Sequence, residues 1–284
     1  MTLLTTSLSH TELQELKAKI EDGLEEWSVK TYPSELRNHL GISEIGKNCS
    51  RQMFYKFRWM FIEEFNGRMR RLFQYGHDSE ARYINYLEGI GCKVYRFDTN
   101  GKQFRVSGVM GHYGGSCDGV VITPWYPNIP FICEFKSHNY KSFSNYLDKK
   151  VQKAKPQHFD QMCGYGEKMQ IEYGLYFPEN KNDSDIQVEV IKLDWQRAKQ
   201  LELKAQDIIL AKEPPAKISD NPAFIDCRLC AAKGICHNGE IPLKNCRSCK
   251  NSSPIQDAQW QCNLCSMIIP SEVIKIGCEK WMPI

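Results

Sequence analysis

The sequence predicts an α/β protein in which a mixed β-sheet is flanked by helices and followed by a small cysteine-rich module. Segments with helical periodicity alternate with short strand-like runs between residues 9 and 211. Eight of the thirteen cysteines lie beyond residue 226. With 284 residues, 42% of them hydrophobic, the chain can bury one large core and carry a small appendage.

Apolar spacing and capping signals define the expected helices. Ser9 and Glu12 form a capping box, which opens a helix that carries apolar residues on one side. These residues are Leu13, Leu16, Ile20, Leu24 and Trp27. Further helices are expected over residues 43–59, 69–87, 157–169 and 194–211, and Asp194 is expected to cap the last of them.

The expected strands cover residues 93–97, 103–109, 118–123, 131–137, 173–177 and 186–193. Pro124, Pro127 and Pro130 separate the third strand from the fourth, so we expect these two to form a hairpin-like pair. A domain boundary is expected where a glycine and a proline separate two groups of cysteines. This boundary divides the chain into residues 1–238 and 239–284.

Two acids and a lysine are expected to meet on neighbouring strands. Asp118 ends the run Gly-Gly-Ser-Cys-Asp, and Glu134 and Lys136 lie two positions apart in the next strand. Because side chains alternate along a strand, Glu134 and Lys136 share one face, while Cys133 and Phe135 point to the other. Such carboxylates can hold a hard divalent cation, with the lysine beside the water that the cation activates.

This arrangement resembles the motif of the PD-(D/E)XK nuclease superfamily. Gly76-x3-Glu80 upstream and Gln161-x3-Tyr165 downstream resemble the flanking motifs of its lambda-exonuclease and RecB-like branches. The resemblance implies a restriction-endonuclease-like fold and hydrolysis of DNA with Mg²⁺ or Mn²⁺. It implies that Asp118 and Glu134 ligate the ion and that Glu80 holds a second ion or orients the first. Lys136 would position the nucleophile. Gln161 and Tyr165 would contact the scissile-strand phosphate or support Lys136. His77 is a candidate further ligand, as histidines near this motif are in some RecB-like relatives.

The same resemblance favours an exonuclease that works from DNA ends in recombination, repair or phage DNA metabolism. The sequence contains no helicase motif, so any unwinding requires a helicase or another recombination or annealing protein as a partner. Two alternatives remain open at this point. The first is a structure- or sequence-specific endonuclease on the same fold, and the second is a non-catalytic DNA-binding or assembly protein.

Local clusters of basic residues are candidate DNA contacts, because the net charge of the chain is only +3. The first cluster lies between Lys47 and Arg71 and is interleaved with Phe54, Tyr55, Phe57, Trp59 and Phe61. The second is a run of lysines between residues 141 and 155. Cations can bind phosphates and aromatic rings can stack on bases, so both clusters could contact DNA. The simpler interpretation is that the rings belong to the core and the charges are solvated at the surface.

The first group of cysteines is Cys227-x2-Cys230-x5-Cys236, which leaves a four-ligand site one thiolate short. Cys49, in Cys-x-Arg-x-x-Phe-Tyr, is the candidate fourth ligand. This pattern resembles the iron–sulfur staple of CRISPR-associated RecB-like exonucleases, which implies a [4Fe-4S] cluster on these four cysteines. A structural zinc site completed by His237 or Cys49 is the alternative.

The second group contains Cys246, Cys249, Cys262, Cys265 and Cys278, in paired Cys-x2-Cys knuckles typical of a small zinc ribbon. Five thiols compete for four places, so the fourth zinc ligand is either Cys265 or Cys278. A second iron–sulfur site is the alternative. The remaining cysteines, Cys92, Cys117, Cys133 and Cys163, are expected in the core.

The sequence favours a cytoplasmic protein. No apolar run approaches the roughly 20 residues that a membrane helix requires. The N-terminus also lacks a basic-then-apolar secretory signal, so the cysteines are expected to serve metals and not disulfides.

Overall fold

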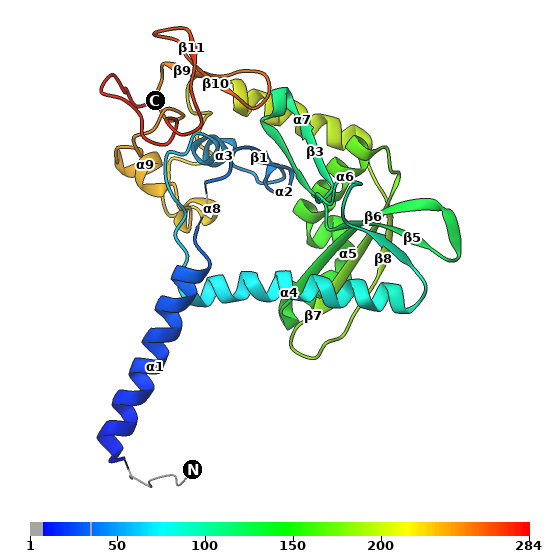
Figure 1. Ribbon diagram of the computed structural model, residues 1–284. Helices are drawn as coiled ribbons and strands as arrows, with labels where there is room; N and C mark the ends of the chain where they lie inside the picture. Colours follow the sequence, from blue (N-terminus) through cyan, green and yellow to red (C-terminus); the bar gives the residue numbers. More distant parts are fainter. Residues whose placement is uncertain (1–7, 35) are drawn as a thin grey trace. The chain divides into compact units, whose positions relative to one another are not determined.

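The computed structural model describes residues 8–34 and 36–284 (Figure 1). The chain divides into two compact units. Of the described residues, the smaller unit contains 8–34 and 63–79, and the larger contains 36–62 and 80–284. No helix within the described ranges is both long enough and apolar enough to cross a membrane.

The larger unit is built on a five-stranded mixed sheet. Its strand order is β2 (Lys93–Tyr95), β5 (Gly119–Thr123), β6 (Tyr126–His138), β7 (Tyr173–Asn180) and β8 (Glu189–Lys192). Strands β6 and β7 run parallel, and the other neighbours are antiparallel. The mixed sheet and the β5–β6 hairpin confirm the sequence prediction.

Helices cover both faces of this sheet (Figure 1). Cys133 and Phe135 of β6 pack with Tyr83 and Leu87 from the last turns of α4 (Gly67–Gly89). On the other face lie α5 (Tyr140–Ala154) and α6 (Pro156–Met169), and α7 (Trp195–Leu210) packs on α6. Glu134 and Lys136 occupy this second face, opposite Cys133 and Phe135, as alternation along the strand predicts.

A second, smaller sheet has the order β1 (Leu40–Gly41), β4 (Tyr113–Ser116) and β3 (Arg105–Gly108), and a 3₁₀ turn (Val109–Gly111) links β3 to β4. The single helix expected over residues 43–59 is instead two helices, α2 (Ile42–Ile45) and α3 (Ser50–Phe57). Gly46, which lies between them, approaches α6 closely. A Cβ at this position would lie 2.8 Å from a carboxylate oxygen of Asp160.

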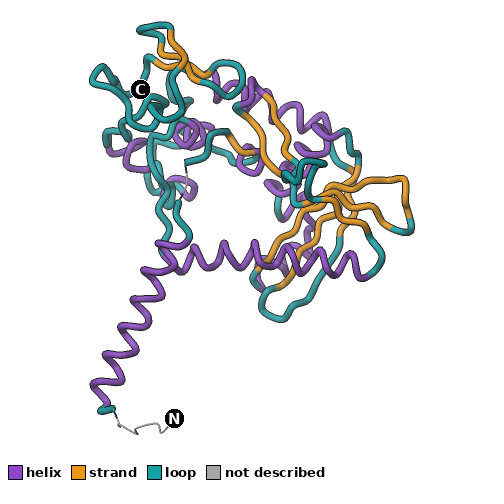
Figure 2. Tube along the Cα trace, in the orientation of Figure 1, coloured by secondary structure: helices purple, strands orange, loops and turns teal. Residues whose placement is uncertain are grey.

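The C-terminal part of the larger unit consists mostly of loops (Figure 2). Its regular elements are α8 (Ile225–Arg228), α9 (Lys233–Asn238) and an antiparallel sheet of β9 (Ser252–Pro254), β10 (Trp260–Cys262) and β11 (Met267–Ile268) in the order β11-β10-β9. The zinc ribbon and the boundary at residue 238 remain predictions.

Arg247 anchors this C-terminal part to the rest of the larger unit. It is 1% exposed, and its guanidinium lies 4.2 Å from the ring centre of Trp59, 4.6 Å from that of Phe57 and 4.7 Å from that of Trp260. It also donates hydrogen bonds to the carbonyl oxygens of residues 37 and 38. Burial and the neighbouring Arg58 guanidinium lower the pKa of Arg247, so the stacked rings and carbonyls must offset the cost of a buried charge.

The smaller unit contains α1 (His10–Thr31) and the start of α4. The capping box is confirmed: the Ser9 hydroxyl accepts a hydrogen bond from the N–H of Glu12, and the Glu12 carboxylate accepts one from the N–H of Ser9. The apolar residues predicted on one side of this helix are all exposed.

Candidate active site

The β5–β6 hairpin brings the predicted acids together. Gly119 pairs with Cys133, so Asp118, which directly precedes β5, lies beside Glu134. The backbone N–H of Phe135 donates a 2.8 Å hydrogen bond to Oδ2 of Asp118. This bond holds the Asp118 carboxylate against the strand that carries Glu134 and Lys136.

Glu134 is a completely buried carboxylate, with 0% exposure. Its Oε2 accepts a 3.0 Å hydrogen bond from Nε2 of Gln161. Its Oε1 forms an ion pair with Nζ of Lys136 but has no partner of hydrogen-bond geometry. Burial raises the pKa of Glu134 to about 8; Lys136 offsets part of this rise, and the charge of Asp118 adds to it. The site therefore lacks positive charge, and a divalent cation fits this deficit.

Lys136 is the positive group among these acids. Burial alone would lower its pKa, but Glu134 and Asp118 outweigh this effect and raise it, so the amine stays protonated. Its Nζ also donates a 3.1 Å hydrogen bond to the carbonyl oxygen of Phe135. About 30% of the side chain is exposed, so the ammonium can meet a substrate at the surface.

Glu80, in the second half of α4, adds its negative charge to the same site and acts on both Glu134 and Lys136. It also forms a 3.2 Å ion pair with Arg96, a residue that the sequence analysis did not single out. His77, three residues earlier, is exposed and belongs to the smaller unit. Its assignment as a metal ligand remains a prediction.

Gln161 and Tyr165 lie one turn apart on α6. Gln161 contacts Glu134 directly, which is neither of its two predicted roles, so contact with the phosphate or with Lys136 stays a prediction. Burial raises the pKa of Tyr165, and the charges of Glu134 and Asp118 raise it further, which places the phenol near both acids. Gly115 of β4 leaves room for this phenol, because a Cβ at position 115 would lie 2.7 Å from Oη of Tyr165.

Gly115→Ala is expected to destabilise the protein by about 1–3 kcal/mol, since the phenol or strand β4 must shift. Tyr165→Phe should restore most of this loss in the double variant, because the nearest ring carbons lie 3.5 Å from the new Cβ, an ordinary contact distance. The measurement is a double-mutant cycle by chemical denaturation. Additive effects of the two substitutions would contradict the close packing of these residues.

Behind the acids lies a polar network that the sequence analysis did not find. The Tyr176 hydroxyl is 2.8 Å from Nε2 of His138 and 2.9 Å from Nδ1 of His158. Nδ1 of His138 lies 3.0 Å from the Ser142 hydroxyl, to which Lys155 donates. Burial, followed by nearby lysines, lowers the pKa of His138 to about 4 and that of His158 to about 2, so both are neutral at physiological pH. The sequence did contain one signal for this network: His138 lies two positions after Lys136 in β6, so it faces the same side of the sheet as Glu134 and Lys136.

The first group of cysteines gathers around one cavity. Cys49, Cys227, Cys230 and Cys236 all line it, and so does His237. Asn48 donates a 3.3 Å hydrogen bond to the Asp226 carboxylate, 178 positions away, which holds the two distant segments together beside the cavity. The Cys49 sulfur accepts a 3.4 Å hydrogen bond from the N–H of Gln52.

The second group of cysteines gathers in the same way. A separate cavity is lined by Cys246, Cys249, Cys262, Cys265 and Cys278, so the structure does not distinguish Cys265 from Cys278 as the fourth ligand. In the part of the chain that the structure describes, no three His, Cys, Asp or Glu side chains form a closed set of metal ligands. Cys92, Cys117, Cys133 and Cys163 are buried, as predicted.

Most of the first basic cluster is used within the fold, so its rings cannot stack on bases, while Arg68 and Arg71 are exposed and DNA contact through them stays a prediction. Phe54, Tyr55, Phe57 and Trp59 are buried in the core. Arg58 donates to the carbonyl oxygens of Ala211, Arg247 and Ser252, and Arg70 donates to those of Tyr32 and Phe65. Lys47 and Lys56 both pair with Glu44. These rings and cations therefore stabilise the fold.

The second basic run keeps its charges at the surface. Lys141, Lys149, Lys150 and Lys153 are exposed on α5, which directly follows the strand that carries Glu134 and Lys136. Helix α5 was not assigned from the sequence. Asn139 caps it by accepting a hydrogen bond from the N–H of Ser142, and Phe143, Tyr146 and Val151 form its buried side.

No family model matches the sequence, and no curated protein is similar to it. Among solved structures, the chain is similar to the alkaline exonuclease LHK-Exo from Laribacter hongkongensis, with 16% identity and a TM-score of 0.42 over 64% of this chain and 90% of that one. LHK-Exo in complex with dAMP gives 16% identity and a TM-score of 0.43 over 60% and 86%. A phage-related exonuclease from Haemophilus somnus gives 14% identity and a TM-score of 0.40 over 56% and 77%. Likeness at this level assigns neither a family nor an activity to the chain.

Proposed function

We propose that this protein is a metal-dependent deoxyribonuclease of the PD-(D/E)XK type. The observation that carries the proposal is the convergence of Asp118, Glu134 and Lys136 at the β5–β6 hairpin, where Gln161 holds the buried Glu134 carboxylate. The motifs around Glu80 and Tyr165 support it further. The charge of Glu80 raises the pKa of Glu134, and the charges of Glu134 and Asp118 raise the pKa of Tyr165.

In this proposal, Asp118 and Glu134 hold Mg²⁺ or Mn²⁺, and Glu80 holds a second ion or orients the first. The bound ion supplies an activated water for in-line attack on a phosphodiester bond and neutralises phosphate charge. Lys136, kept protonated by its acidic neighbours, presents an ammonium where charge develops on the phosphate. Gln161 fixes the orientation of Glu134 through its 3.0 Å hydrogen bond.

We further propose that the enzyme acts on DNA ends. The exposed lysines of α5 follow the site strand directly and supply cations for the phosphates of the bound strand. The motif order of the lambda-exonuclease and RecB-like branches favours the same mode of action. The site chemistry is equally suited to an endonuclease, so the form of the substrate must decide between the two.

The test compares end-labelled linear duplex, linear single strands and covalently closed circles, each with Mg²⁺ or Mn²⁺. Degradation of linear DNA from its ends with intact circles is the expected result. Efficient cutting of closed circles would establish the endonuclease alternative. Folded, metal-supplied protein that cleaves none of these substrates would refute the nuclease and leave the non-catalytic DNA-binding protein.

We also propose that Cys49, Cys227, Cys230 and Cys236 hold a [4Fe-4S] cluster. The support is that all four thiols line one cavity although Cys49 is remote in sequence. His237 lines the same cavity and would complete the zinc alternative. For the second cavity we propose Zn²⁺ on Cys246, Cys249, Cys262 and either Cys265 or Cys278, which stabilises a segment built mostly of loops.

Removing two charges from α5 is expected to weaken DNA binding without impairing the chemical step. Lys149→Ala combined with Lys153→Ala should reduce the slope of log affinity against log salt by about 2, since each phosphate contact contributes about 0.9. Binding is measured with a linear duplex in Ca²⁺ across a salt series. The control removes two exposed lysines elsewhere in the larger unit, Lys199 and Lys212. Equal losses in both variants would argue against a DNA path over α5.

A further inference from the structure

Helix α1 exposes a stripe of large apolar side chains. Leu13 is 50% exposed, Leu16 45%, Ile20 54%, Leu24 53% and Trp27 54%. Within this helix of 22 residues, Ser28 is the buried residue. Single exposed apolar residues are common, but a continuous stripe along a helix marks a surface that another molecule or segment covers.

The spacing of the stripe is symmetric about Ile20. Leu16 and Leu24 lie four positions on either side of it, and Leu13 and Trp27 lie seven positions on either side. Offsets of four and seven keep all these residues on one face of a helix with 3.6 residues per turn. This symmetric spacing lets each apolar residue meet an apolar residue of the partner when two identical helices pair antiparallel about a two-fold axis.

We propose that a second copy of this chain covers the stripe, so that α1 pairs with its counterpart in an antiparallel arrangement about Ile20. Ile20 then meets the partner's Ile20, Leu16 meets the partner's Leu24, and Leu13 meets the partner's Trp27. The five half-exposed side chains of each copy would together remove about 1,000 Å² from water, the size at which specific interfaces begin. The inference holds whatever reaction the acidic site performs.

Charges beside the stripe form both attractive and repulsive pairs in this arrangement. In an antiparallel two-fold pair, each flank of the helix faces the same flank of the partner. Lys17 then falls near the partner's Glu21 and Glu12 near the partner's Lys30, whereas Lys19 falls equally near the partner's Lys19 and Glu12 equally near the partner's Glu26. Within one copy, Lys17 and Glu21 form a 3.5 Å pair that is largely exposed, so it is weak and can exchange partners.

The same charges argue against DNA or an anionic membrane as the occupant. The acidic residues of α1 are Glu12, Glu15, Glu21, Asp22, Glu25 and Glu26, and its lysines are Lys17, Lys19 and Lys30. A helix with this excess of acids repels polyanions. The choice of a second copy as the occupant therefore rests on the spacing of the apolar residues and on the area that they would bury.

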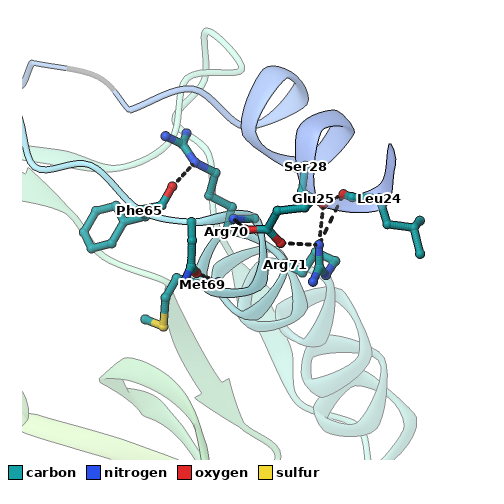
Figure 3. Close-up of polar contacts among 9 residues, drawn as sticks. Leu24, Glu25, Ser28, Phe65, Met69, Arg70 and Arg71 are labelled. Carbon is teal, nitrogen blue, oxygen red and sulfur yellow. Dashed lines mark hydrogen bonds and ion pairs between the residues drawn. The ribbon is translucent and has the colours of Figure 1, made fainter. Parts of the chain in front are cut away.

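The polar contacts between α1 and the start of α4 are made by Glu25, Ser28 and the carbonyl oxygen of Leu24 (Figure 3). Glu25 accepts a hydrogen bond from the N–H of Gly67 and pairs with Arg71 at 3.5 Å. Arg71 also donates to the Ser28 hydroxyl at 2.8 Å and to the carbonyl oxygen of Leu24 at 3.3 Å. These polar contacts lie on one flank of α1, beside the apolar side chains and not on them.

The test measures the mass of the full chain in solution by sedimentation and light scattering. Wild-type protein is expected at twice the chain mass of 32.9 kDa. Ile20→Glu places two like charges at the two-fold axis and should give a monomer. Ala18→Glu adds the same charge on the far side of the helix and should leave the dimer intact. A wild-type monomer at all concentrations, or a dimer that survives Ile20→Glu, would overturn the proposal.

A mixing experiment tests the antiparallel direction. Leu16→Glu and Leu24→Lys should each weaken the dimer at least tenfold when studied alone, because each buries a charge against a leucine. Mixed in equal amounts they should form a heterodimer, since the new glutamate meets the partner's new lysine. No rescue on mixing would exclude the antiparallel pairing about Ile20. A wild-type monomer with protected α1 amides in hydrogen exchange would instead assign the stripe to its own chain.

Discussion

Glu134→Gln is expected to reduce DNA cleavage by about a thousand-fold or more, because the amide cannot serve as a charged ligand. The substitution keeps the volume of the side chain, and the amide oxygen can still accept the hydrogen bond from Gln161. Cleavage of end-labelled linear DNA is measured at saturating metal, with DNA binding assayed separately. Activity within tenfold of wild type would remove Glu134 from the proposed site.

The same variant has a second readout that does not depend on activity. The pKa of Glu134 is raised to about 8 from its ordinary value of 4.5, so the folded state holds this proton more tightly than the unfolded chain does. In metal-free buffer the carboxyl therefore costs stability as the pH rises from about 4.5 to about 8. Glu134→Gln should melt at a higher temperature than wild type at pH 8 and at a similar one at pH 4.5. The control is Asp220→Asn, which removes an exposed carboxylate. A Glu134→Gln variant that melts below wild type at pH 8 would contradict this account of the buried charge.

Cys49→Ala is expected to abolish cluster binding and to cause the largest loss of stability of any single cysteine replacement. A cluster on this cavity would join Cys49 to Cys227 and close a very long loop, which constrains the unfolded chain most. Anaerobically purified wild-type protein should be brown, with about four irons and one zinc per chain. The variant should lose the iron and the colour but keep the zinc, because the second cavity has its own thiols.

Cys92→Ala is the matched control for this experiment. Cys92 is buried in the core between α4 and the sheet and does not line either cysteine cavity. Its replacement should cost some stability through lost packing but no iron. Colourless, fully folded wild-type protein with two zincs and no iron would refute the cluster and support two zinc sites.

The strands and the main helices could be predicted from the sequence because their patterns are local. Alternation around Glu134 gave the correct faces of β6, and Ser9 and Asp194 cap their helices as expected. Helix α5 was missed because its lysines were interpreted only as a charge run, although Asn139 before it was a usable capping signal. Strand β4 was missed because its two glycines give little preference for a strand.

The candidate site shows a similar division between local and long-range information. Spacing along the chain selected Asp118, Glu134 and Lys136, and the family resemblance added Gln161; the structure brings these four residues together. Arg96 and the histidines around Tyr176 acquire their roles through contacts between remote segments, and such contacts leave no local pattern. The aromatic residues near Arg58 suggested a DNA surface, but the same composition also suits a core, and only tertiary packing decides between them.

The position of Arg247 has a consequence for how the protein is made. The guanidinium that stacks on Trp59 also bonds to the carbonyl oxygen of Arg37, 210 positions earlier in the chain. During synthesis, the segment around residues 36–62 therefore leaves the ribosome long before its packing partners exist. Domains usually fold in order as they emerge. Here the rings that pack on Arg247 must stay exposed until the segment around residue 247 has been translated, which makes a chaperone important for the yield of the protein.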